Sequence, residues 1–464
     1  MLREWQLECA EKAVQKYKNG QRHFFCQATP GAGKTVLAAT VASRLLQDNM
    51  IDLVLCFSPS LTVSDGIKTT FAQALNCSFS GGLGSIGQSL TYQSLKFLND
   101  EFWRTLDNYR VFVVFDEIHH CSGTCFEDAN TWGQQILLRI QRSATFTLAM
   151  SGTPWRSDCL PIVMGEYKDP SGKLLVDYQY TLKRAIEEGI CRTPRIVLVD
   201  NEQLSVASEG KVESFSSILE MMKQTNTSYQ SVIHNKDAME YLLKLGCRQL
   251  AKLRIQSPNA GGLVVAASVN HANMIKNILV QKYYQTVSMV TYRHQEPLAE
   301  IEKYRKANTQ WIVSVGMISE GTDIPRLQVC CHMSSTKTEL YFRQVLGRIL
   351  RVNSKIKQYA WLFTFAEPNL ISFSQRVEED IPQCCKILRV VGQVEYNIDP
   401  NNSILSETAS LESHSVSSSE VVWCSKSMSN EKSRKYLQDI QDINEVNFGC
   451  FRQRVISAFV DFQT

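Results

Sequence analysis

Short apolar runs alternate with helix-like segments through the first 365 residues. The runs are rich in β-branched and aromatic residues, as strands are, and they fall into two sets. Fully apolar runs such as Val111-Phe112-Val113-Val114-Phe115 are typical of parallel strands covered by helices on both faces. The pattern therefore predicts an α/β architecture that occurs twice. The expected strands cover 24–28, 52–58, 111–116 and 145–151 in the first set, and 195–199, 262–267, 287–292, 311–315, 328–333 and 359–365 in the second.

The same pattern predicts where the chain divides. Thr193-Pro194 interrupts a helix-like segment, so we expect a first domain at 1–192 and a second at 193–368. A polar, helix-prone stretch follows at about 201–258. Residues 369–464 are expected to form a C-terminal extension. Within it, 401–433 is rich in serine and is expected as a flexible linker, and a small helix that caps the second domain or forms a separate module is expected from the spacing of Tyr436, Leu437, Ile440, Ile443 and Val446.

The composition excludes some classes of protein but does not indicate a function. The chain has 464 residues, of which 44% are hydrophobic, and a net charge of +3, which is too small to indicate a polyanionic partner. The N-terminus has no apolar leader-like run, and no stretch reaches the length that a membrane span needs. Fifteen cysteines, an odd number, are scattered through apolar segments. We therefore expect a cytoplasmic protein with reduced thiols and no membrane contact.

A metal site is a minor alternative within this composition. His119-His120-Cys121 and Cys125 offer four zinc-ligand types within seven positions. No second ligand pair follows at the spacing of a zinc finger, so an ordinary loop or helix face is favoured over a zinc site.

The first chemical motif is Ala28-Thr29-Pro30-Gly31-Ala32-Gly33-Lys34-Thr35, which follows an expected strand and opens a helix. In a loop of this kind backbone N–H groups surround phosphates, Lys34 reaches the β and γ oxygens, and the Thr35 hydroxyl ligates Mg²⁺. The first position of the pattern holds Ala28 where glycine is usual. Alone, the match would also suit a kinase, a GTPase, a transporter ATPase or an ordinary glycine-rich turn.

The second motif is a pair of carboxylates at the end of an apolar strand, Asp116 and Glu117. The carboxyl ends of parallel strands meet at the crevice where ligands bind. Asp116 is suited to hold the hydration shell of Mg²⁺, and Glu117 to orient and deprotonate an attacking water. A solvated acidic pair after a core strand is the alternative, and the preceding phosphate loop makes it less favourable.

These motifs together resemble a known family. Asp116-Glu117-Ile118-His119 is a DExH box, and residues 2 to 366 resemble the superfamily II helicases and translocases, in which the phosphate loop often begins with alanine. The remaining resemblances occur in the family's order: Leu2-Arg3-Glu4-Trp5-Gln6, Ser58-Pro59-Ser60 (motif Ia), Thr91-Tyr92-Gln93-Ser94, Ser151-Gly152-Thr153-Pro154 (motif III), Ala266-Ala267-Ser268 (motif IV), Ser319-Glu320-Gly321-Thr322-Asp323-Ile324-Pro325 (motif V) and Gln344-Val345-Leu346-Gly347-Arg348-Ile349-Leu350-Arg351 (motif VI).

Motif VI has a physical logic of its own. Its spacing places Gln344, Gly347, Arg348 and Arg351 on one face of a helix. Two guanidinium groups can then enter a cleft between domains and stabilise charge that develops on a γ-phosphate. Without the other motifs, the pattern could equally be a basic surface.

The resemblance implies a fold of two RecA-like domains and a set of site residues. ATP and Mg²⁺ are expected to bind between the domains, with Lys34, Glu117, Gln344, Arg348 and Arg351 as catalytic residues. Nucleotide contacts are implied for Gln6, Thr29, Pro30, Gly31, Ala32, Gly33, Lys34, Thr35, Asp116, Gly321 and Asp323, and nucleic-acid contacts for Ser58, Pro59, Thr91, Gln93, Ser268 and Thr322. Trp155-Arg156, directly after motif III, could contact nucleic acid, or Trp155 could pack into the domain surface.

The expected activity is that of an ATP-dependent DNA helicase or translocase, related to the motor subunits of restriction enzymes. Asp-Glu-Ile-His-His together with Ser-Glu-Gly-Thr-Asp-Ile-Pro favours that branch over RNA unwinding. An RNA helicase, or an ATP-gated switch in a defence or repair complex, remains an alternative. No nuclease motif is found after Pro368, so any nuclease would be a separate partner.

Overall fold

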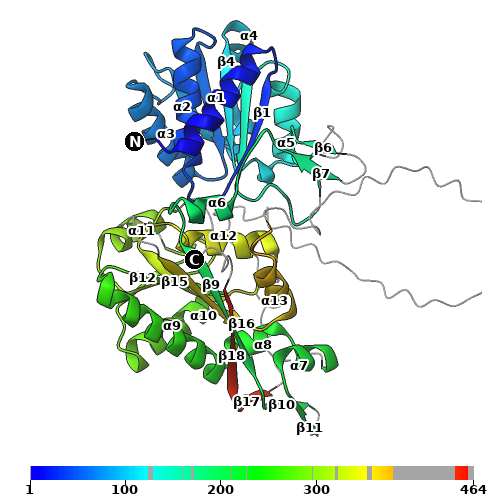
Figure 1. The fold of residues 1–464 in the computed structure, drawn as a ribbon, viewed down its shortest axis with the longest axis vertical. Coiled ribbons are helices and arrows are strands. Elements are labelled where there is room, and N and C mark those ends of the chain that lie inside the picture. Colours follow the sequence, from blue (N-terminus) through cyan, green and yellow to red (C-terminus); the bar gives the residue numbers. More distant parts are fainter. Residues whose placement is uncertain are drawn as a thin grey trace, which may run out of the picture.

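The computed structural model describes residues 2–123, 129–158, 160–168, 172–208, 211–225, 227–294, 296–318, 322–352, 358–379 and 445–457. Two α/β units lie one above the other in Figure 1, the first built around β1 and β4 and the second around β9, β12 and β15. Helix α6 (Leu182–Glu187) lies between them in the chain and in the picture. This arrangement is that of two RecA-like domains.

The first sheet has six parallel strands in the order β3-β2-β4-β5-β1-β8. Alternate residues of β4 point to opposite faces: Phe112 and Val114 join one hydrophobic cluster, and Val113 and Phe115 join another. Helices therefore cover both faces, as the apolar run predicted. The strands are β1 (His23–Ala28), β2 (Leu53–Ser58), β3 (Gly87–Thr91), β4 (Val111–Asp116), β5 (Phe146–Ser151) and β8 (Tyr178–Tyr180).

Three helices cover the first face and the other elements cover the second. α1 (Glu4–Lys18), α2 (Lys34–Gln47) and α3 (Leu61–Leu75) pack side by side, each contacting the next. The opposite face carries η1 (Tyr92–Phe97), α4 (Asp100–Asn108), η2 (Ile118–His120), α5 (Thr131–Gln135) and η3 (Ile136–Ile140). A hairpin of β6 (Glu166–Lys168) and β7 (Lys173–Leu175) follows β5.

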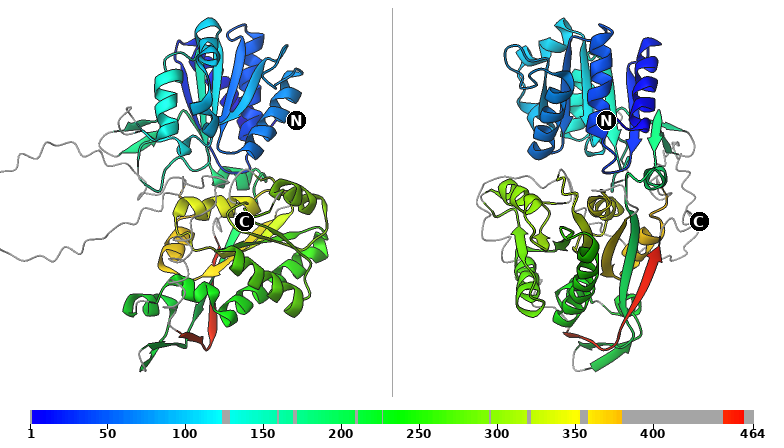
Figure 2. Two further views of the ribbon diagram at one scale, coloured as in Figure 1. Left: turned by 180° about the vertical axis from the view of Figure 1, so that it is seen from behind. Right: turned by 60° about the vertical axis from the view of Figure 1, so that its left-hand side comes forward.

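The second sheet has seven strands in the order β13-β14-β12-β15-β16-β9-β18, parallel except for β18. Figure 2 shows β18 beside β9 at the edge of this sheet, although about 250 residues separate them in the chain. The strands are β9 (Thr193–Asn201), β12 (Gly261–Ala266), β13 (Val287–Val290), β14 (Trp311–Ser314), β15 (Leu327–Met333), β16 (Tyr359–Phe365) and β18 (Phe451–Ser457). The helices include α9 (Lys236–Gln256), α10 (Val269–Asn277), η4 (Ile278–Lys282), α11 (Pro297–Lys306), α12 (Glu339–Ile349) and α13 (Pro368–Gln375).

Every strand expected from the sequence is present, with bounds that differ by at most two residues. Two parts of the expectation were wrong. The stretch after Asn201 begins with β10 (Leu204–Ser208) and β11 (Lys211–Phe215) before α7 (Ile218–Gln224) and α8 (Tyr229–His234). Val446, expected in a helix, lies in β17 (Glu445–Phe448), which pairs with β10.

Val446 and Phe448 alternate with Asn447, and a period of two is that of a strand. The other positions of the expected helix, and the serine-rich segment 401–433, lie outside the described residues. Within the described residues, no helix is both long and apolar enough to cross a membrane.

Candidate nucleotide site

The loop between β1 and α2 has the backbone shape that a phosphate site requires. Gly31 and Gly33 have φ values of 82° and 95°, a left-handed region that favours glycine. Gly33 is the N-cap of α2, and no side chain in the described part of the chain caps this helix. The first N–H groups of α2 therefore face the loop, with the positive end of the helix dipole behind them.

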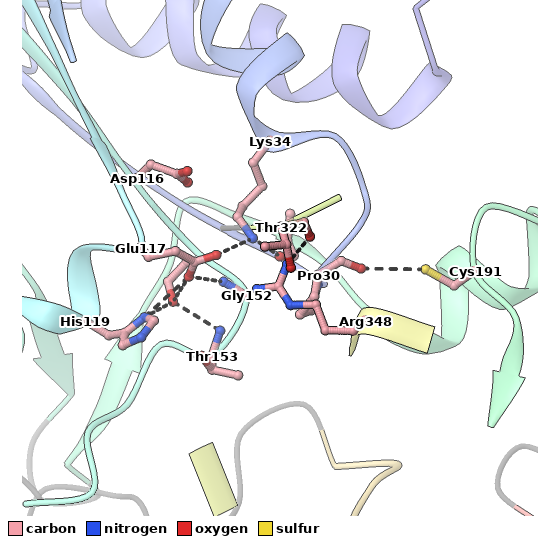
Figure 3. Close-up of polar contacts among 12 residues, drawn as sticks. Pro30, Lys34, Asp116, Glu117, His119, Gly152, Thr153, Cys191, Thr322 and Arg348 are labelled. Carbon is pink, nitrogen blue, oxygen red and sulfur yellow. Dashed lines mark hydrogen bonds and ion pairs between the residues drawn. The ribbon is translucent and has the colours of Figure 1, made fainter. Parts of the chain in front are cut away.

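Lys34 and Glu117 form an ion pair at the centre of the site. Lys34 Nζ lies 2.9 Å from Glu117 Oε1 and 3.4 Å from the carbonyl oxygen of Ala28. Glu117, directly after β4, has a φ of 51°, which turns its side chain toward the phosphate loop (Figure 3). The phosphate loop and the DExH box thus meet at the carboxyl edge of the sheet, as the order β4-β5-β1 dictates.

Motif III is bonded to the same glutamate. Glu117 Oε2 accepts from the Ser151 hydroxyl and from the Gly152 N–H, both at 3.4 Å. His119 Nδ1 lies 2.9 Å from Ser151 Oγ and 3.4 Å from Glu117 Oε2. The sequence offered His119 as part of the DExH box and as a possible zinc ligand, and the structure shows it joining motif II to motif III.

Asp116 is the residue best suited to hold a metal. Its side chain is 6% exposed, and Oδ1 makes no hydrogen bond within the described part of the chain. Burial, followed by the neighbouring Glu117 carboxylate, raises the pKa of Asp116 to about 7. A buried carboxylate oxygen without a partner is costly, so this atom fits a hydrated Mg²⁺ brought by a nucleotide. Thr35 is the second residue of α2, on the same loop.

Helix α12 of the second sheet lies directly on the phosphate loop. A Cβ at Gly347 would lie 2.7 Å from Pro30 Cβ, and a Cβ at Gly31 would lie 2.9 Å from Arg351 Cγ. The absence of both side chains is what permits this approach. Both arginines predicted for the site, Arg348 and Arg351, therefore lie at the junction of the two domains.

The two arginines are held by motif V. Arg348 Nη1 and Arg351 Nη1 donate to the carbonyl oxygen of Thr322 at 2.8 and 3.0 Å, and Arg351 also forms an ion pair with Asp323 (Figure 3 shows the Arg348 bond). Asp323 thus contacts a motif VI arginine here. Gly321 lies outside the described residues, and Gln344 lies on α12 one turn before Arg348.

A buried arginine that the sequence did not single out supports the end of α12. Arg192 donates to the carbonyl oxygens of Leu327, Ile349 and Pro325 at 2.8, 3.0 and 3.1 Å, and burial lowers its pKa to about 9. The thiol of its neighbour Cys191 lies 3.9 Å from the carbonyl oxygen of Pro30. No sequence pattern signals this role, because it depends on contacts more than 130 residues apart.

The N-terminal motif contacts the same loop. Gln6 Nε2 donates to the Gly33 carbonyl oxygen at 2.9 Å, and Gln6 Oε1 accepts from the Arg3 N–H at 2.9 Å. The Arg3 guanidinium donates to the Ala32 carbonyl oxygen at 2.5 Å. Gln6, for which the family resemblance implies a nucleotide contact, therefore lies at the phosphate loop, and Arg3 of the same N-terminal motif contacts this loop as well.

The residues predicted to contact nucleic acid are only partly accessible. Ser58 is fully buried, the Ser268 hydroxyl caps α10, and the Thr322 side chain is 4% exposed. Gln93 donates to the Pro59 carbonyl oxygen at 3.0 Å, joining η1 to the loop that follows β2, and Thr91 ends β3. These six residues remain predictions as nucleic-acid contacts.

The structure bears on two alternatives from the sequence: the nucleic-acid contact of Trp155-Arg156 and the zinc site near His119. Trp155 is 4% exposed and its ring contacts the guanidinium of Arg343 on α12, so it is not a stacking platform in this structure. Arg156 pairs with Asp158 and donates to the His119 carbonyl oxygen at 2.7 Å. Cys125 lies outside the described residues; among those described, no three His, Cys, Asp or Glu side chains gather as a metal cluster.

Comparison with known proteins places these features in a family. The family described as "Type III restriction enzyme, res subunit" matches residues 1–156, and the family described as "Helicase conserved C-terminal domain" matches residues 245–353. The first match contains the motifs from the N-terminal segment to motif III, and the second contains motifs IV, V and VI.

Individual relatives agree with this placement. The chain is 30% identical over 398 residues to an uncharacterized protein of Mycobacterium leprae, covering 81% of this chain and 64% of that protein. It therefore spans less than two-thirds of the length of that relative. It is 23% identical over 389 residues to a protein of Sulfurisphaera tokodaii named as a DNA 3'-5' translocase, covering 76% of this chain and 79% of that protein.

Solved structures share the fold. One is an ATP-dependent Type ISP restriction-modification enzyme, LlaBIII, bound to DNA (TM-score 0.52, 14% identity, 78% of this chain and 27% of that chain). Another is a fragment described as an HsdR subunit of a type I restriction enzyme from Vibrio vulnificus (TM-score 0.55, 16% identity, 82% of this chain and 67% of that chain). With two family matches in tandem, at residues 1–156 and 245–353, and the helicase motifs assembled at one junction, the chain is similar to the superfamily II helicases related to the Res-subunit motors of restriction enzymes.

Proposed function

We propose that the chain is an ATP-dependent DNA helicase or translocase that hydrolyses ATP between two RecA-like domains, residues 1–192 and 193–368. The observation that carries the proposal is the meeting of two half-sites. Lys34 and Glu117 of the first sheet form one half. Arg348 and Arg351, on and just beyond α12, form the other, with Gly31 and Pro30 of the phosphate loop in direct contact with this segment.

Each residue of the first half-site has a separate role in ATP hydrolysis. The first N–H groups of α2 and Lys34 bind the β and γ phosphates. A phosphate oxygen competes with Glu117 for Lys34 Nζ, and its binding releases Glu117 Oε1 to accept the proton of an attacking water. Asp116 and Thr35 would hold Mg²⁺, which would supply charge neutralisation at the phosphates.

The second half-site supplies positive charge. Arg348 and Arg351 can turn from the Thr322 carbonyl oxygen toward the γ-phosphate, and Gln344 lies one turn away on α12. Guanidinium groups that stabilise charge on a transferring phosphoryl group raise rates by roughly 10³–10⁵-fold. Because motif V holds these arginines, contacts of motif V with a nucleic acid provide a route by which the nucleic acid could stimulate hydrolysis.

The choice of DNA rests on relatives. The Sulfurisphaera protein is named as a DNA translocase, and the LlaBIII structure contains DNA. We extend that substrate class to this chain, and we assign any nuclease or restriction activity to a separate partner.

The test is ATP hydrolysis with single-stranded DNA, duplex DNA or RNA added, followed by displacement of a third strand from a DNA triplex. Stimulation by DNA with triplex displacement supports the proposal. Stimulation by RNA alone indicates an RNA helicase, and stimulation by DNA without displacement indicates an ATP-gated switch.

Two substitutions test the site itself. Lys34→Ala and Glu117→Gln should each lower kcat by about 10²–10⁴-fold, the contribution of a positioned catalytic group. Lys18→Ala, on the far exposed end of α1, is the matched lysine control and should retain full activity. Full turnover by either site variant would remove the proposed site.

A further inference from the structure

Helix α12 meets the first domain along a single stripe. Arg343 and Gly347 are four residues apart on α12 and lie on one side of this helix, and Arg351 follows two residues after its end at Ile349. Gly347 lies against Pro30 and Arg351 against Gly31. The third member, Arg343, is one turn before Gly347 and belongs to no motif in the sequence.

Arg343 covers the tryptophan that follows motif III. Its guanidinium carbon lies 5.3 Å from the ring centroid of Trp155, within the range of a cation–π contact. The Trp155 side chain is 4% exposed and that of Arg343 is 11% exposed. The contact is thus largely shielded from water, where a cation–π interaction is strongest.

The second domain fixes the direction of this guanidinium. Arg343 Nη2 and Nε donate to Glu339 Oε1 at 2.9 and 3.1 Å. The same group donates to the carbonyl oxygens of Arg376 and Glu379 at 2.6 and 2.7 Å. Glu339 is in turn bonded to the Arg376 guanidinium at 2.8 Å. Arg343 is therefore held in one orientation before it meets the tryptophan.

The first domain connects the tryptophan to the catalytic carboxylate within five residues. The Trp155 N–H donates to the Thr153 carbonyl oxygen at 2.8 Å, and the Thr153 N–H donates to Ser151 Oγ at 3.1 Å. Ser151 Oγ and the Gly152 N–H both donate to Glu117. A short bonded segment therefore runs from Glu117 to Trp155.

We propose that Arg343 and Trp155 are positioning residues that form an interdomain latch. The latch seats α12 against motif III, so that Arg348 and Arg351 reach the phosphate loop while motif III holds Glu117. This inference rests on the proposed ATP hydrolysis, and it adds to it the contact that couples the two half-sites.

The first test is a double-mutant cycle on the full chain. Trp155→Leu leaves the Glu339 pair intact, and Arg343→Gln removes the guanidinium. Each should lower the nucleic-acid-stimulated kcat about tenfold, the factor that a loss of about 1.4 kcal/mol produces, with KM for ATP changed less than about twofold. The double variant should be no slower than the slower single variant.

The matched control removes a cation–π contact that does not cross between the domains. Arg195 lies 3.9 Å from the ring centroid of Tyr359, and both belong to the second sheet. Arg195→Gln should keep the wild-type kcat. Multiplied losses in the double variant, or unchanged kcat in the single variants, would overturn the latch.

A spectroscopic readout separates the latch from the proposed activity. The fluorescence emission of Trp155 is obtained by subtracting the emission spectrum of Trp155→Phe from that of the wild-type protein. Arg343→Gln should shift this emission to longer wavelength, because the ring gains water, whereas Arg195→Gln should not. If this shift occurs in a protein without ATPase activity, the contact stands and the proposed function fails. If hydrolysis is normal and the shift is absent, the latch fails alone.

Discussion

Replacing Gly347 by alanine adds one methyl group to the face of α12 that lies on the phosphate loop. The new Cβ would lie 2.7 Å from Pro30 Cβ and 3.1 Å from Pro30 Cγ. A proline ring has no rotamer into which these atoms can withdraw, so the helix itself has to move. An ordinary carbon–carbon contact is about 3.5–4.0 Å, which implies a displacement of about 1 Å.

That displacement acts on activity more than on stability. A reacting group misplaced by about 1 Å can lower a rate about 10²-fold, and Arg348 and Arg351 move with the helix. We therefore expect kcat to fall about 100-fold with little change in KM for ATP. The free energy of unfolding should not fall. Alanine stabilises a helix interior by about 1 kcal/mol relative to glycine, and the crowded contact lies between two domains that can separate without unfolding.

The assay is steady-state ATP hydrolysis with saturating nucleic acid, accompanied by urea unfolding of the same preparations. Gly66→Ala is the matched control, since Gly66 lies in α3 with no neighbouring atom within 4 Å of its added Cβ. It should keep full activity. A Gly347→Ala protein with undiminished kcat would refute the reasoning, because α12 would then not need its close approach to Pro30.

Two further substitutions probe the support of α12. Arg192→Met leaves the carbonyl oxygens of Leu327, Ile349 and Pro325 without their donor, at about 1–3 kcal/mol each, so urea unfolding should show a loss of about 3 kcal/mol or more; an unchanged midpoint would contradict this role. Burial lowers the pKa of His332, beneath α12, to about 4. Between about pH 6.5 and pH 4 the unfolded chain binds a proton that the folded chain does not, so stability should fall as pH falls, by about 3 kcal/mol in total. His332→Leu should flatten this dependence in unfolding curves measured at pH 7, 6 and 5, and an equally steep dependence would assign it to other groups.

The interior strands were predictable because their physics is local. β4 is apolar at every position but the last, since both of its faces are covered. Edge strands lack that signal: β3 is a polar run, partly exposed, that pairs with a single neighbour in the first sheet, and β8 has three residues. Val446 was wrongly expected in a helix because its spacing from the apolar residues before it was used, whereas its alternation with Asn447 and Phe448 follows the period of two of β17.

The candidate site residues that belong to short sequence motifs could be predicted from the sequence. Lys34, Glu117 and Arg348 were each selected from a motif, and the structure brings their segments to one junction. The partners of these residues were not predictable. Arg192 and Arg343 act through contacts with residues distant in the chain, and nothing in their neighbouring residues distinguishes them from surface arginines.

The position of β18 has a consequence for folding during synthesis on the ribosome. All six strands of the first sheet lie within residues 23–180, so that sheet can form early during synthesis. The second sheet needs residues 451–457 to cover the edge of β9, which begins at Thr193. Until residues 451–457 have emerged from the ribosome, β9 presents an unpaired edge of the kind that invites aggregation. The second domain is therefore the one expected to need protection by chaperones.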